Sequence, residues 1–158
     1  NKTNFDINEM IRNTASSFEV QCNSKNITIE LIFSNVSQYV IGDYTKIQQV
    51  LYNLIDNAIK FTKSTINITA KRNNLYLIIE VTDNGIGIEP DNLSQIFNRM
   101  YQTEQSRNKK SNHGIGLGLY FVDKVVHLHH GTITAKSELG VFTTFIITLP
   151  LSDTEDME

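Results

Sequence analysis

The sequence predicts an α+β fold: a two-layer sandwich in which about three helices cover one face of a mixed, mostly antiparallel sheet. Segments with helical periodicity and segments with strand-like alternation are both present, but they do not alternate regularly along the chain, which disfavours a parallel βαβ arrangement. The 158 residues are 40% hydrophobic and 20% charged. This size and composition are typical of one domain with a single core.

Four segments have the periodicity or the starting residues of helices. Asp6 and Glu9 form a capping-box-like start to the first helix, and Asp43 opens the second. In the second helix a wide apolar stripe runs from Ile47 to Ile59, which suits a helix that lies on a sheet. The predicted helices are residues 7–23, the segment that Asp43 opens, residues 91–97 and residues 116–128.

Five segments are predicted to be strands. Residues 27–33 alternate apolar and polar side chains with period two, as a half-buried strand does. Asn73 and Asn74 are expected to form a tight hairpin turn between two later strands, because asparagine tolerates positive φ. The predicted strands are residues 27–33, 66–71, 75–82, 132–136 and 142–149.

The composition excludes several functional classes. The net charge of −3 and the pI of about 5.8 provide no positive field for nucleic acid, so no nucleic-acid partner is expected. No apolar run approaches the roughly 20 residues that a membrane span requires. Cys22 is the only cysteine, so no internal disulfide can form, and a reducing cytoplasmic compartment is expected.

The N-terminal end of the chain predicts a domain that belongs to a longer protein. The sequence begins at Asn1 and carries no signal-like stretch, so any sensor or membrane part is expected to lie outside it. We predict one domain over residues 1–151 and a frayed acidic tail over residues 152–158.

Three groups of residues have the chemistry of a binding site. In the first group, Asn53, Asn57 and Lys60 are at positions i, i+4 and i+7 of the second helix and therefore share an arc of roughly 60°. An ordinary solvated helix edge is one interpretation of this arc. The functional alternative is that a neutral amide oxygen binds magnesium while the lysine contacts phosphate, which leaves the metal mostly hydrated, as magnesium prefers.

The second group is the segment from Asp83 to Ile88 (DNGIGI), which follows a predicted strand and contains two glycines. An Asn-Gly hairpin turn is the alternative, but the residues that follow do not resemble a returning strand. A buried aspartate at a strand end can accept a hydrogen bond from the amino group of adenine, whereas guanine presents a carbonyl oxygen to the same carboxylate. The segment therefore predicts a site that selects ATP over GTP.

The third group, residues 113–119 (HGIGLGL), joins a polar segment to a predicted helix. Glycines at a helix N-terminus expose backbone N–H groups to anions, which suits a triphosphate. No Lys-Ser or Lys-Thr pair follows, so this is not a Walker loop, and no strand precedes it, so it is a poor dinucleotide fingerprint. A flexible hinge is the alternative. The polar residues 98–113 are predicted to form a mobile loop.

In this order and spacing, the three groups resemble the N, G1 and G2 boxes of histidine kinases in the GHKL superfamily, whose ATP-binding domains have the Bergerat fold. The resemblance extends over essentially the whole chain, from Phe5 to Pro150, and includes the run from Gln49 to Thr62 (QVLYNLIDNAIKFT). It implies ATP and Mg²⁺ as cofactors.

The resemblance also implies roles for individual residues. Asn57 would be the magnesium ligand, Asn53 its phosphate-side neighbour and Lys60 a phosphate contact, so that Asn53 and Lys60 take part in catalysis. Asp83 would bind adenine, and residues 98–113 would form the ATP lid. The ATP-binding residues that it implies are Asn53, Asn57, Lys60, Phe61, Asp83, Gly85, Gly87, Ile88, Phe97, Gly114, Gly116, Leu117, Gly118, Leu119 and Thr143.

Two positions depart from the family pattern. In the F box, usually Ile-Phe-x-x-Phe, Met100 replaces the second aromatic residue. In the short motif near the end, usually Gly-x-Gly-Thr, Phe142 replaces the second glycine and is expected to alter the far wall of the cleft. Four basic residues are candidates for lid contacts or, equally, solvated loop charges: Arg99, Arg107, Lys109 and Lys110.

Position 53 favours phosphoryl transfer over hydrolysis. In the hydrolytic relatives of this superfamily, which resemble gyrase, the Hsp90 chaperones and MutL, a glutamate four residues before the magnesium-binding asparagine orients the attacking water. Asn53 cannot accept a proton as a carboxylate can, so transfer of the γ-phosphoryl group to a histidine is predicted. None of the four histidines of this chain has the His-Glu-x-x-x-Pro setting of the family's acceptor.

The resemblance thus predicts the catalytic domain of a cytoplasmic protein-histidine kinase, or of the cytoplasmic part of a membrane-bound sensor. Its expected partners are the helical dimerisation hairpin that carries the acceptor histidine, absent from this chain, and a response regulator receiver domain downstream. The isolated domain is expected to be monomeric and the parent kinase a homodimer. The alternatives are a degenerate nucleotide-binding interaction module and a protein-serine kinase of the anti-sigma-factor type.

Overall fold

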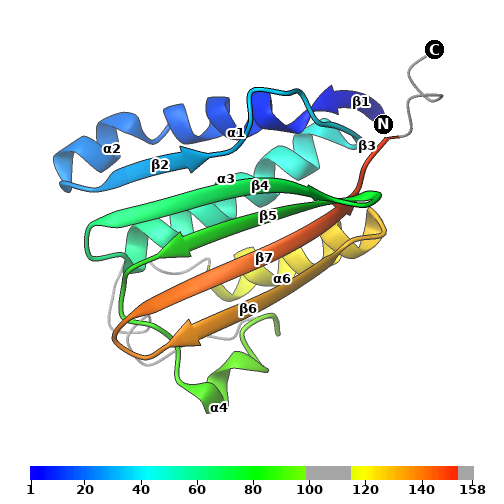
Figure 1. Ribbon diagram of the computed structural model, residues 1–158. Helices are drawn as coiled ribbons and strands as arrows, with labels where there is room; N and C mark the ends of the chain where they lie inside the picture. Colours follow the sequence, from blue (N-terminus) through cyan, green and yellow to red (C-terminus); the bar gives the residue numbers. More distant parts are fainter. Residues whose placement is uncertain (99–114, 153–158) are drawn as a thin grey trace.

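The computed structural model describes residues 1–98 and 115–152. These residues form a twisted sheet with a layer of helices against one of its faces (Figure 1), which confirms the predicted α+β sandwich. The main sheet has the strand order β2-β4-β5-β7-β6, and a separate small sheet pairs β1 with β3. The strands are β1 (Thr3–Asp6), β2 (Thr28–Ile32), β3 (Tyr39–Gly42), β4 (Thr65–Asn73), β5 (Tyr76–Asp83), β6 (Thr132–Glu138) and β7 (Phe142–Pro150).

The main sheet is mixed, as predicted. Its β2 and β4 strands are parallel, and the other three neighbouring pairs are antiparallel. The β4–β5 hairpin closes on the pair Asn73 and Tyr76, so its two-residue turn is Asn74 and Leu75. The prediction of a turn at Asn73-Asn74 was therefore wrong by one residue. Asn74 supplies the positive φ of 56°, while Asn73 still pairs within β4.

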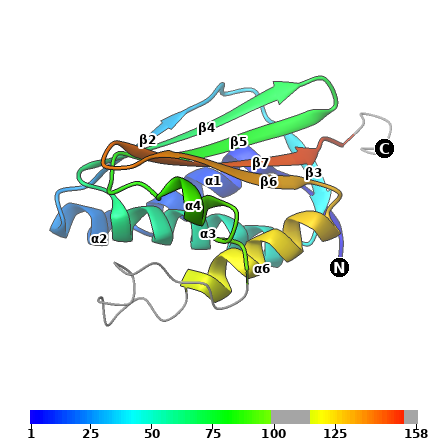
Figure 2. The same ribbon diagram turned by 90° about the horizontal axis from the view of Figure 1, so that it is seen from below.

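The helices all lie on the same side of the sheet, as the view from below shows (Figure 2). Asp6 caps the first helix by accepting a hydrogen bond from the Asn8 N–H at 3.0 Å, and Asp43 caps the third in the same way through Lys46. The helices are α1 (Ile7–Ser16), α2 (Glu19–Ser24), α3 (Tyr44–Phe61), α4 (Pro90–Leu93) and α6 (Ile115–Leu128).

The prediction of one continuous helix over residues 7–23 was wrong. The chain breaks between α1 and α2 at Ser17, whose hydroxyl donates to the Thr14 carbonyl oxygen at 2.6 Å. Thr14 in turn donates to the Met10 carbonyl, and such side-chain bonds compete with the helical backbone for its acceptors. The break turns Phe18 into the core, where only 2% of it is exposed.

Three further differences come from short elements. The helix predicted over residues 91–97 is limited to α4, with Pro90 in its first turn, where proline fits the helix without losing a hydrogen bond. Ile96 and Phe97 lie after it, and Ile96 is buried. β1 and β3 were not predicted, because each has only four residues, too few for a clear period-two pattern.

The core lies between the sheet and the helices. Alternate residues of β4 and β5, including Ile68 and Ile79, are fully buried against the apolar stripe of α3 around Leu54. This packing fixes α3 across the sheet and leaves its polar arc at the edge of the apolar stripe. Over residues 1–98 and 115–152, none of the helices has the length and apolarity that crossing a membrane requires.

Candidate nucleotide site

The polar arc of α3 faces the beginning of α6. Gln49 Nε2 donates a hydrogen bond of 2.7 Å to Asn53 Oδ1, and Asn53 Nδ2 faces the Gly118 carbonyl oxygen at 3.5 Å. The helix therefore brings a residue of the first predicted group to a glycine of the third, 65 residues further along the chain. The first and third groups therefore lie together.

Asn57 lies one turn further along α3 and differs from Asn53 in its hydrogen bonding. Its Oδ1 atom is buried and has no hydrogen-bond partner within the described part of the chain. A buried polar atom is normally satisfied, because leaving an acceptor unpaired costs about 1 to 3 kcal/mol. Such an orphaned oxygen fits a ligand that supplies the missing positive partner, such as a metal ion.

Lys60 completes the arc. Its Nζ lies 3.2 Å from Asp56 Oδ2, one turn earlier on the same helix, and both side chains are partly exposed. This ion pair keeps the ammonium group close to the helix surface that also carries Asn53 and Asn57. The predicted arc therefore includes a carboxylate that the sequence analysis did not single out.

Asp83 ends β5 and is buried, with 3% of its surface exposed. Burial raises the pKa of the Asp83 carboxyl to about 6, and the Gly85 N–H, which donates to Asp83 Oδ1 at 2.8 Å, offsets part of that rise. A carboxylate can accept about four hydrogen bonds, so the group retains acceptor capacity for a ligand. Its cross-strand neighbour on β7 is Thr143, which is also buried.

The two glycines after Asp83 have steric reasons to be glycine. A Cβ at Gly85 would come within 1.9 Å of the Phe61 carbonyl oxygen, and a Cβ at Gly87 within 2.4 Å of the Glu138 carbonyl oxygen. Gly87 also has a φ of +72°, which other residues rarely adopt. The loop is therefore wedged between the end of α3 and the end of β6.

Asn84, between these residues, was quoted in the motif but given no role. Its Oδ1 accepts hydrogen bonds of 2.9 to 3.0 Å from the Thr62 hydroxyl and from the backbone N–H groups of Ser64 and Thr65. Its Nδ2 donates to the Ser64 hydroxyl at 2.9 Å. Asn84 thus pins the loop after β5 to the connection between α3 and β4, which no local sequence pattern indicates.

Ser137 holds the other side of the same loop and was also missed. The Ile88 N–H donates to Ser137 Oγ at 2.7 Å, and the hydroxyl donates to the Phe142 carbonyl oxygen. Thr143 Oγ1 lies 2.9 Å from the same hydroxyl. Phe142, which replaces a family glycine, is therefore linked to this loop through its backbone carbonyl and Ser137.

Some of the remaining predicted residues are described by the structure, and the others are not. Phe97 packs edge-on against Phe145 of β7, with ring centroids 6.3 Å apart, and Leu119 is buried in the core. Gly116 and Leu117 lie in the first turn of α6. Gly114, Met100 and the four basic candidates lie outside the described residues, as does the predicted lid apart from Asn98.

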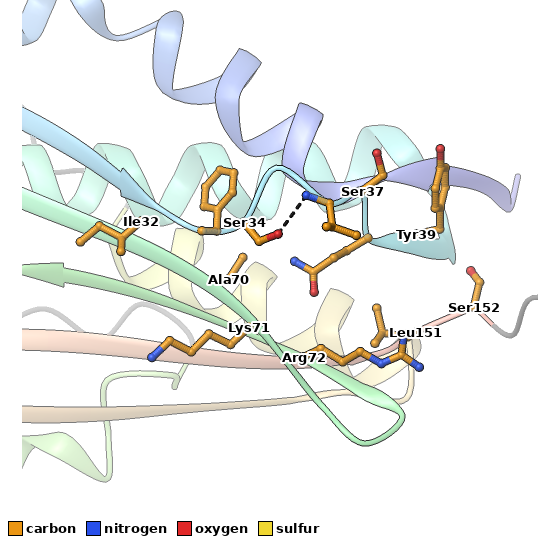
Figure 3. A pocket seen from close by; sticks show the side chains of 12 residues that line it. Ile32, Ser34, Ser37, Tyr39, Ala70, Lys71, Arg72, Leu151 and Ser152 are labelled. Atoms are coloured by element: carbon orange, nitrogen blue, oxygen red, sulfur yellow. Dashed lines mark hydrogen bonds between the residues drawn. The ribbon is translucent and has the colours of Figure 1, made fainter.

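A separate groove lies at the other end of the domain (Figure 3). Its volume is about 860 Å³, and its walls are the ends of β2 and β4, the β2–β3 connection and the chain end at Leu151 and Ser152. Lys71 and Arg72 are its charged residues. None of the predicted nucleotide-site residues lines this groove, so the groove is not the predicted nucleotide site.

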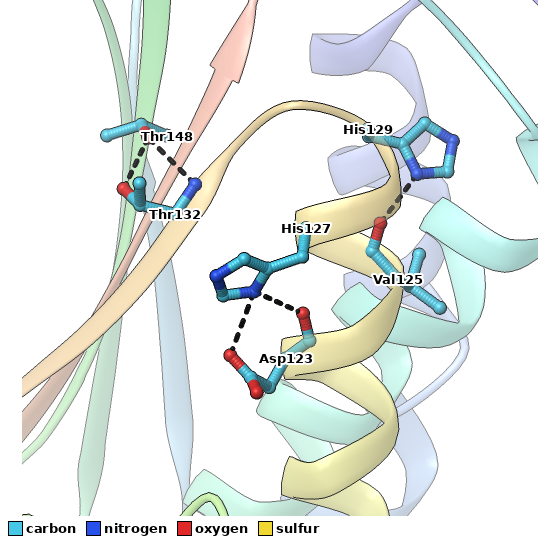
Figure 4. A network of polar contacts seen from close by, with 6 residues as sticks. All are labelled: Asp123, Val125, His127, His129, Thr132 and Thr148. Atoms are coloured by element: carbon cyan, nitrogen blue, oxygen red, sulfur yellow. Dashed lines mark hydrogen bonds and ion pairs between the residues drawn. The ribbon is translucent and has the colours of Figure 1, made fainter.

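The three described histidines lie at or just beyond the end of α6. Figure 4 shows two of them, His127 and His129. His129 is buried, with Nδ1 2.7 Å from the Val125 carbonyl oxygen and Nε2 accepting from the Asp43 N–H at 3.0 Å. His127 lies 3.1 Å from Asp123, and His130 takes the positive φ of 62° that ends the helix. The fourth histidine, His113, lies outside the described residues.

Comparison with known proteins identifies the family. Residues 42–153 match the family described as histidine kinase-, DNA gyrase B-, and HSP90-like ATPase. The chain is 36% identical over 150 residues to the sensor protein RprX of Bacteroides fragilis, covering 92% of this chain and 29% of RprX. It is 44% identical over 110 residues to the sensor protein SrrB of Staphylococcus aureus, covering 68% of this chain and 19% of SrrB.

Solved structures agree with this result. The catalytic domain of the histidine kinase ThkA superposes with a TM-score of 0.82 at 29% identity, covering 95% of this chain and 97% of that one. Full-length ShkA, solved in complex with AMPPNP, superposes with a TM-score of 0.85 at 26% identity, covering 97% of this chain and 32% of that one.

The chain therefore belongs to the histidine kinase-, DNA gyrase B-, and HSP90-like ATPase family. Within it, the chain is similar to the ATP-binding catalytic domains of sensor histidine kinases, which confirms the superfamily predicted from the three boxes. The chain spans less than a third of the length of the curated relatives that it matches.

Proposed function

We propose that this chain is the ATP-binding catalytic domain of a two-component sensor histidine kinase and that it supplies the γ-phosphoryl group to a histidine on a separate helical hairpin. The observation that carries the proposal is that two of the predicted site residues present buried acceptor atoms. Asp83 is a buried carboxylate at a strand end, and Asn57 Oδ1 is a buried unpaired amide oxygen. One suits the amino group of adenine and the other suits a metal ion.

The adenine half of the site is built from the end of β5 and the glycine loop. Asp83 accepts from the adenine amino group in this proposal, and guanine is disfavoured because its carbonyl oxygen would face the carboxylate. Gly85 packs closely against the Phe61 carbonyl, so any larger residue would move this loop and Asp83 with it. Gly87, Ile88 and Thr143 complete the wall beside it.

The phosphate half is built from α3 and the start of α6. Asn57 Oδ1 would bind Mg²⁺, which prefers oxygen ligands and keeps most of its water, and the ion would neutralise phosphate charge. The described residues contain no group of three or more His, Cys, Asp or Glu side chains able to hold a metal ion. A single amide ligand together with phosphate oxygens and water fits this composition. Lys60 and the first turn of α6 provide further positive partners.

The proposed reaction is an in-line transfer. A neutral histidine nitrogen of the hairpin attacks the γ-phosphorus, a nitrogen–phosphorus bond forms, and the bond from phosphorus to the bridging oxygen breaks. ADP leaves with that electron pair, and the proton on the other ring nitrogen passes to solvent. Asn53 and Lys60 hold the phosphates in place while the charge moves to ADP.

The acceptor is proposed to lie outside this chain, and the side chains of two of the described histidines already have other partners. Both ring nitrogens of His129 contact backbone groups, and His127 is paired with Asp123 on the outside of α6. A response regulator receiver domain is the proposed downstream partner, and a cytoplasmic location and a homodimeric parent kinase remain predictions.

Calorimetric titration tests this proposal. ATP with Mg²⁺ is titrated into the wild-type chain and into Asn57→Ala and Asp83→Ala, with GTP as the control ligand and far-UV circular dichroism to verify folding. We expect ATP to bind, GTP not to bind, and each substitution to weaken ATP binding at least tenfold, as the loss of one charged hydrogen bond or metal ligand predicts. Radiolabelled ATP and a supplied hairpin then test transfer.

The outcomes separate the alternatives. Tight ATP binding without transfer to any supplied histidine hairpin would favour a nucleotide-binding interaction module, and acid-stable phosphoserine on a protein substrate would favour a serine kinase. If the folded wild-type chain does not bind ATP, the nucleotide site is wrong.

A further inference from the structure

Gln49 lies one turn before Asn53 on α3, and the motif assigns it no role. Its Nε2 donates a 2.7 Å hydrogen bond to Asn53 Oδ1. On the opposite side of the same amide, Asn53 Nδ2 faces the Gly118 carbonyl oxygen at 3.5 Å, and a Cβ at Gly118 would lie 3.8 Å from that nitrogen. The Asn53 amide is therefore held with its oxygen toward Gln49 and its amino group toward the start of α6.

The orientation of this amide determines what it offers a nucleotide. An asparagine side chain can turn by 180° and exchange its oxygen and its amino group with almost no change of shape. Phosphate oxygens only accept hydrogen bonds, so an amino group attracts them and a carbonyl oxygen repels them. A residue that keeps the Asn53 oxygen occupied therefore biases the amide toward the form that binds phosphate.

We propose that Gln49 is a positioning residue of the nucleotide site: by donating to Asn53 Oδ1 it keeps the Asn53 amino group directed at the phosphates. This inference rests on the proposed function, because it requires a nucleotide whose phosphates lie between α3 and the start of α6. Gln49 itself does not contact the nucleotide.

Asn57 has the same side chain as Asn53 but a different hydrogen-bonding environment. Gln49, Asn53 and Asn57 are spaced by four residues and form one row along α3. Asn53 Oδ1 in this row has a side-chain donor, whereas Asn57 Oδ1 has no hydrogen-bond partner in the described structure. Two chemically identical side chains thus present opposite ends: Asn53 an amino group for phosphate, and Asn57 an oxygen for the metal.

The sharpest test exchanges the donor for an acceptor of the same shape. Gln49→Glu cannot donate, so its carboxylate attracts the Asn53 amino group and turns the oxygen toward the phosphates. Gln49→Ala only removes the bias, because Asn53 remains able to adopt either orientation. We expect ATP affinity to fall about twofold in Gln49→Ala and about tenfold in Gln49→Glu, the second being the effect of one inverted hydrogen bond.

A matched variant controls for the added charge. Gln48→Glu places the same negative charge one residue away, about 100° around the helix, where it cannot contact Asn53. Its ATP affinity is expected to stay within about twofold of wild type. All variants are titrated with ATP and with adenosine in the presence of Mg²⁺, following amide shifts by NMR. Adenosine has no phosphate, so its affinity is expected to be unchanged in each variant.

A double-mutant cycle links the effect to Asn53. In an Asn53→Ala background, Gln49→Glu is expected to lower the ATP affinity no more than Gln48→Glu does, because there is no Asn53 amide left to turn. The proposal is wrong if Gln49→Glu lowers the ATP affinity no more than Gln48→Glu does, or if it lowers the adenosine affinity equally. It is also wrong if Gln49→Glu still lowers the ATP affinity in the Asn53→Ala background. If wild type binds adenosine and ATP equally or not at all, the proposed nucleotide site itself fails, and this inference fails with it.

Discussion

The backbone N–H of Gly85 donates a 2.8 Å hydrogen bond to Oδ1 of Asp83, in a turn where Gly85 also lies against the carbonyl group of Phe61. One glycine therefore positions the buried carboxylate and connects it to the end of α3, 22 residues earlier in the chain. This contact joins the loop that follows Asp83 to the helix that carries Asn57 and Lys60.

The two glycines of the site are expected to respond differently to alanine. In Gly85→Ala the new Cβ would lie 1.9 Å from the Phe61 carbonyl oxygen, so the loop must move and both stability and ATP affinity fall, stability by about 2 kcal/mol or more. In Gly118→Ala the nearest atoms are 3.8 Å away and the residue is helical, so stability should rise by about 0.5 to 1 kcal/mol. Urea unfolding measures both, and equal effects would contradict the close contact at Gly85.

Asp83→Asn is expected to stabilise the chain without nucleotide while it abolishes selective ATP binding. The raised pKa of Asp83, about 6, means that its charged form is disfavoured by folding, by up to about 3 kcal/mol at neutral pH. Asparagine is uncharged and can still accept a hydrogen bond from the Gly85 N–H. Its amino group, however, would face the amino group of adenine, and two donors cannot form a hydrogen bond with each other. Thermal unfolding at pH 7.5 with and without ATP measures both effects. A variant less stable than wild type at this pH would contradict the burial argument.

The sign of the pH dependence follows from the same group. Because the folded pKa of Asp83 lies above its unfolded value of 3.8, its contribution to stability is fully present below pH 3.8 and is lost as the pH rises through about 6. The advantage of Asp83→Asn should therefore be largest above pH 6 and should disappear below pH 4. ATP affinity has the opposite trend, because the protonated carboxyl accepts poorly: it should fall as the pH decreases through 6. If the ATP affinity does not change between pH 7.5 and pH 5, Asp83 is excluded as the adenine acceptor.

His129→Ala is expected to destabilise the fold by about 2 to 4 kcal/mol without changing the nucleotide site. The substitution removes a buried ring and leaves the Asp43 N–H, at the start of α3, without its acceptor. His127→Ala, two residues away on the exposed side of α6, should change stability by less than about 0.5 kcal/mol. Chemical unfolding distinguishes the two variants, and at temperatures where both are folded their ATP affinities should match wild type.

The sequence predicted those parts of the molecule that depend on local spacing. The apolar stripe of α3, the strand endings at Asp83 and the glycines before α6 have periods or residue types that indicate their elements directly. The order of the three boxes sufficed to predict the superfamily. Boundaries were less predictable: the break at Ser17 depends on side-chain hydroxyls that compete for helical carbonyls, which apolar periodicity does not detect.

What the sequence by itself determined is which chemical groups are available and on which elements they lie: amides on one face of a helix, a carboxylate at the end of a strand, glycines at a turn. Only the tertiary structure decided which of these groups are buried, which are already paired and which remain unpaired. The Asn84 and Ser137 hydrogen bonds that hold the loop, and the bond from Asp43 to His129 across 86 residues, join distant segments. Local spacing carries no information about such contacts, because they form only when the core brings α3, the sheet and α6 together.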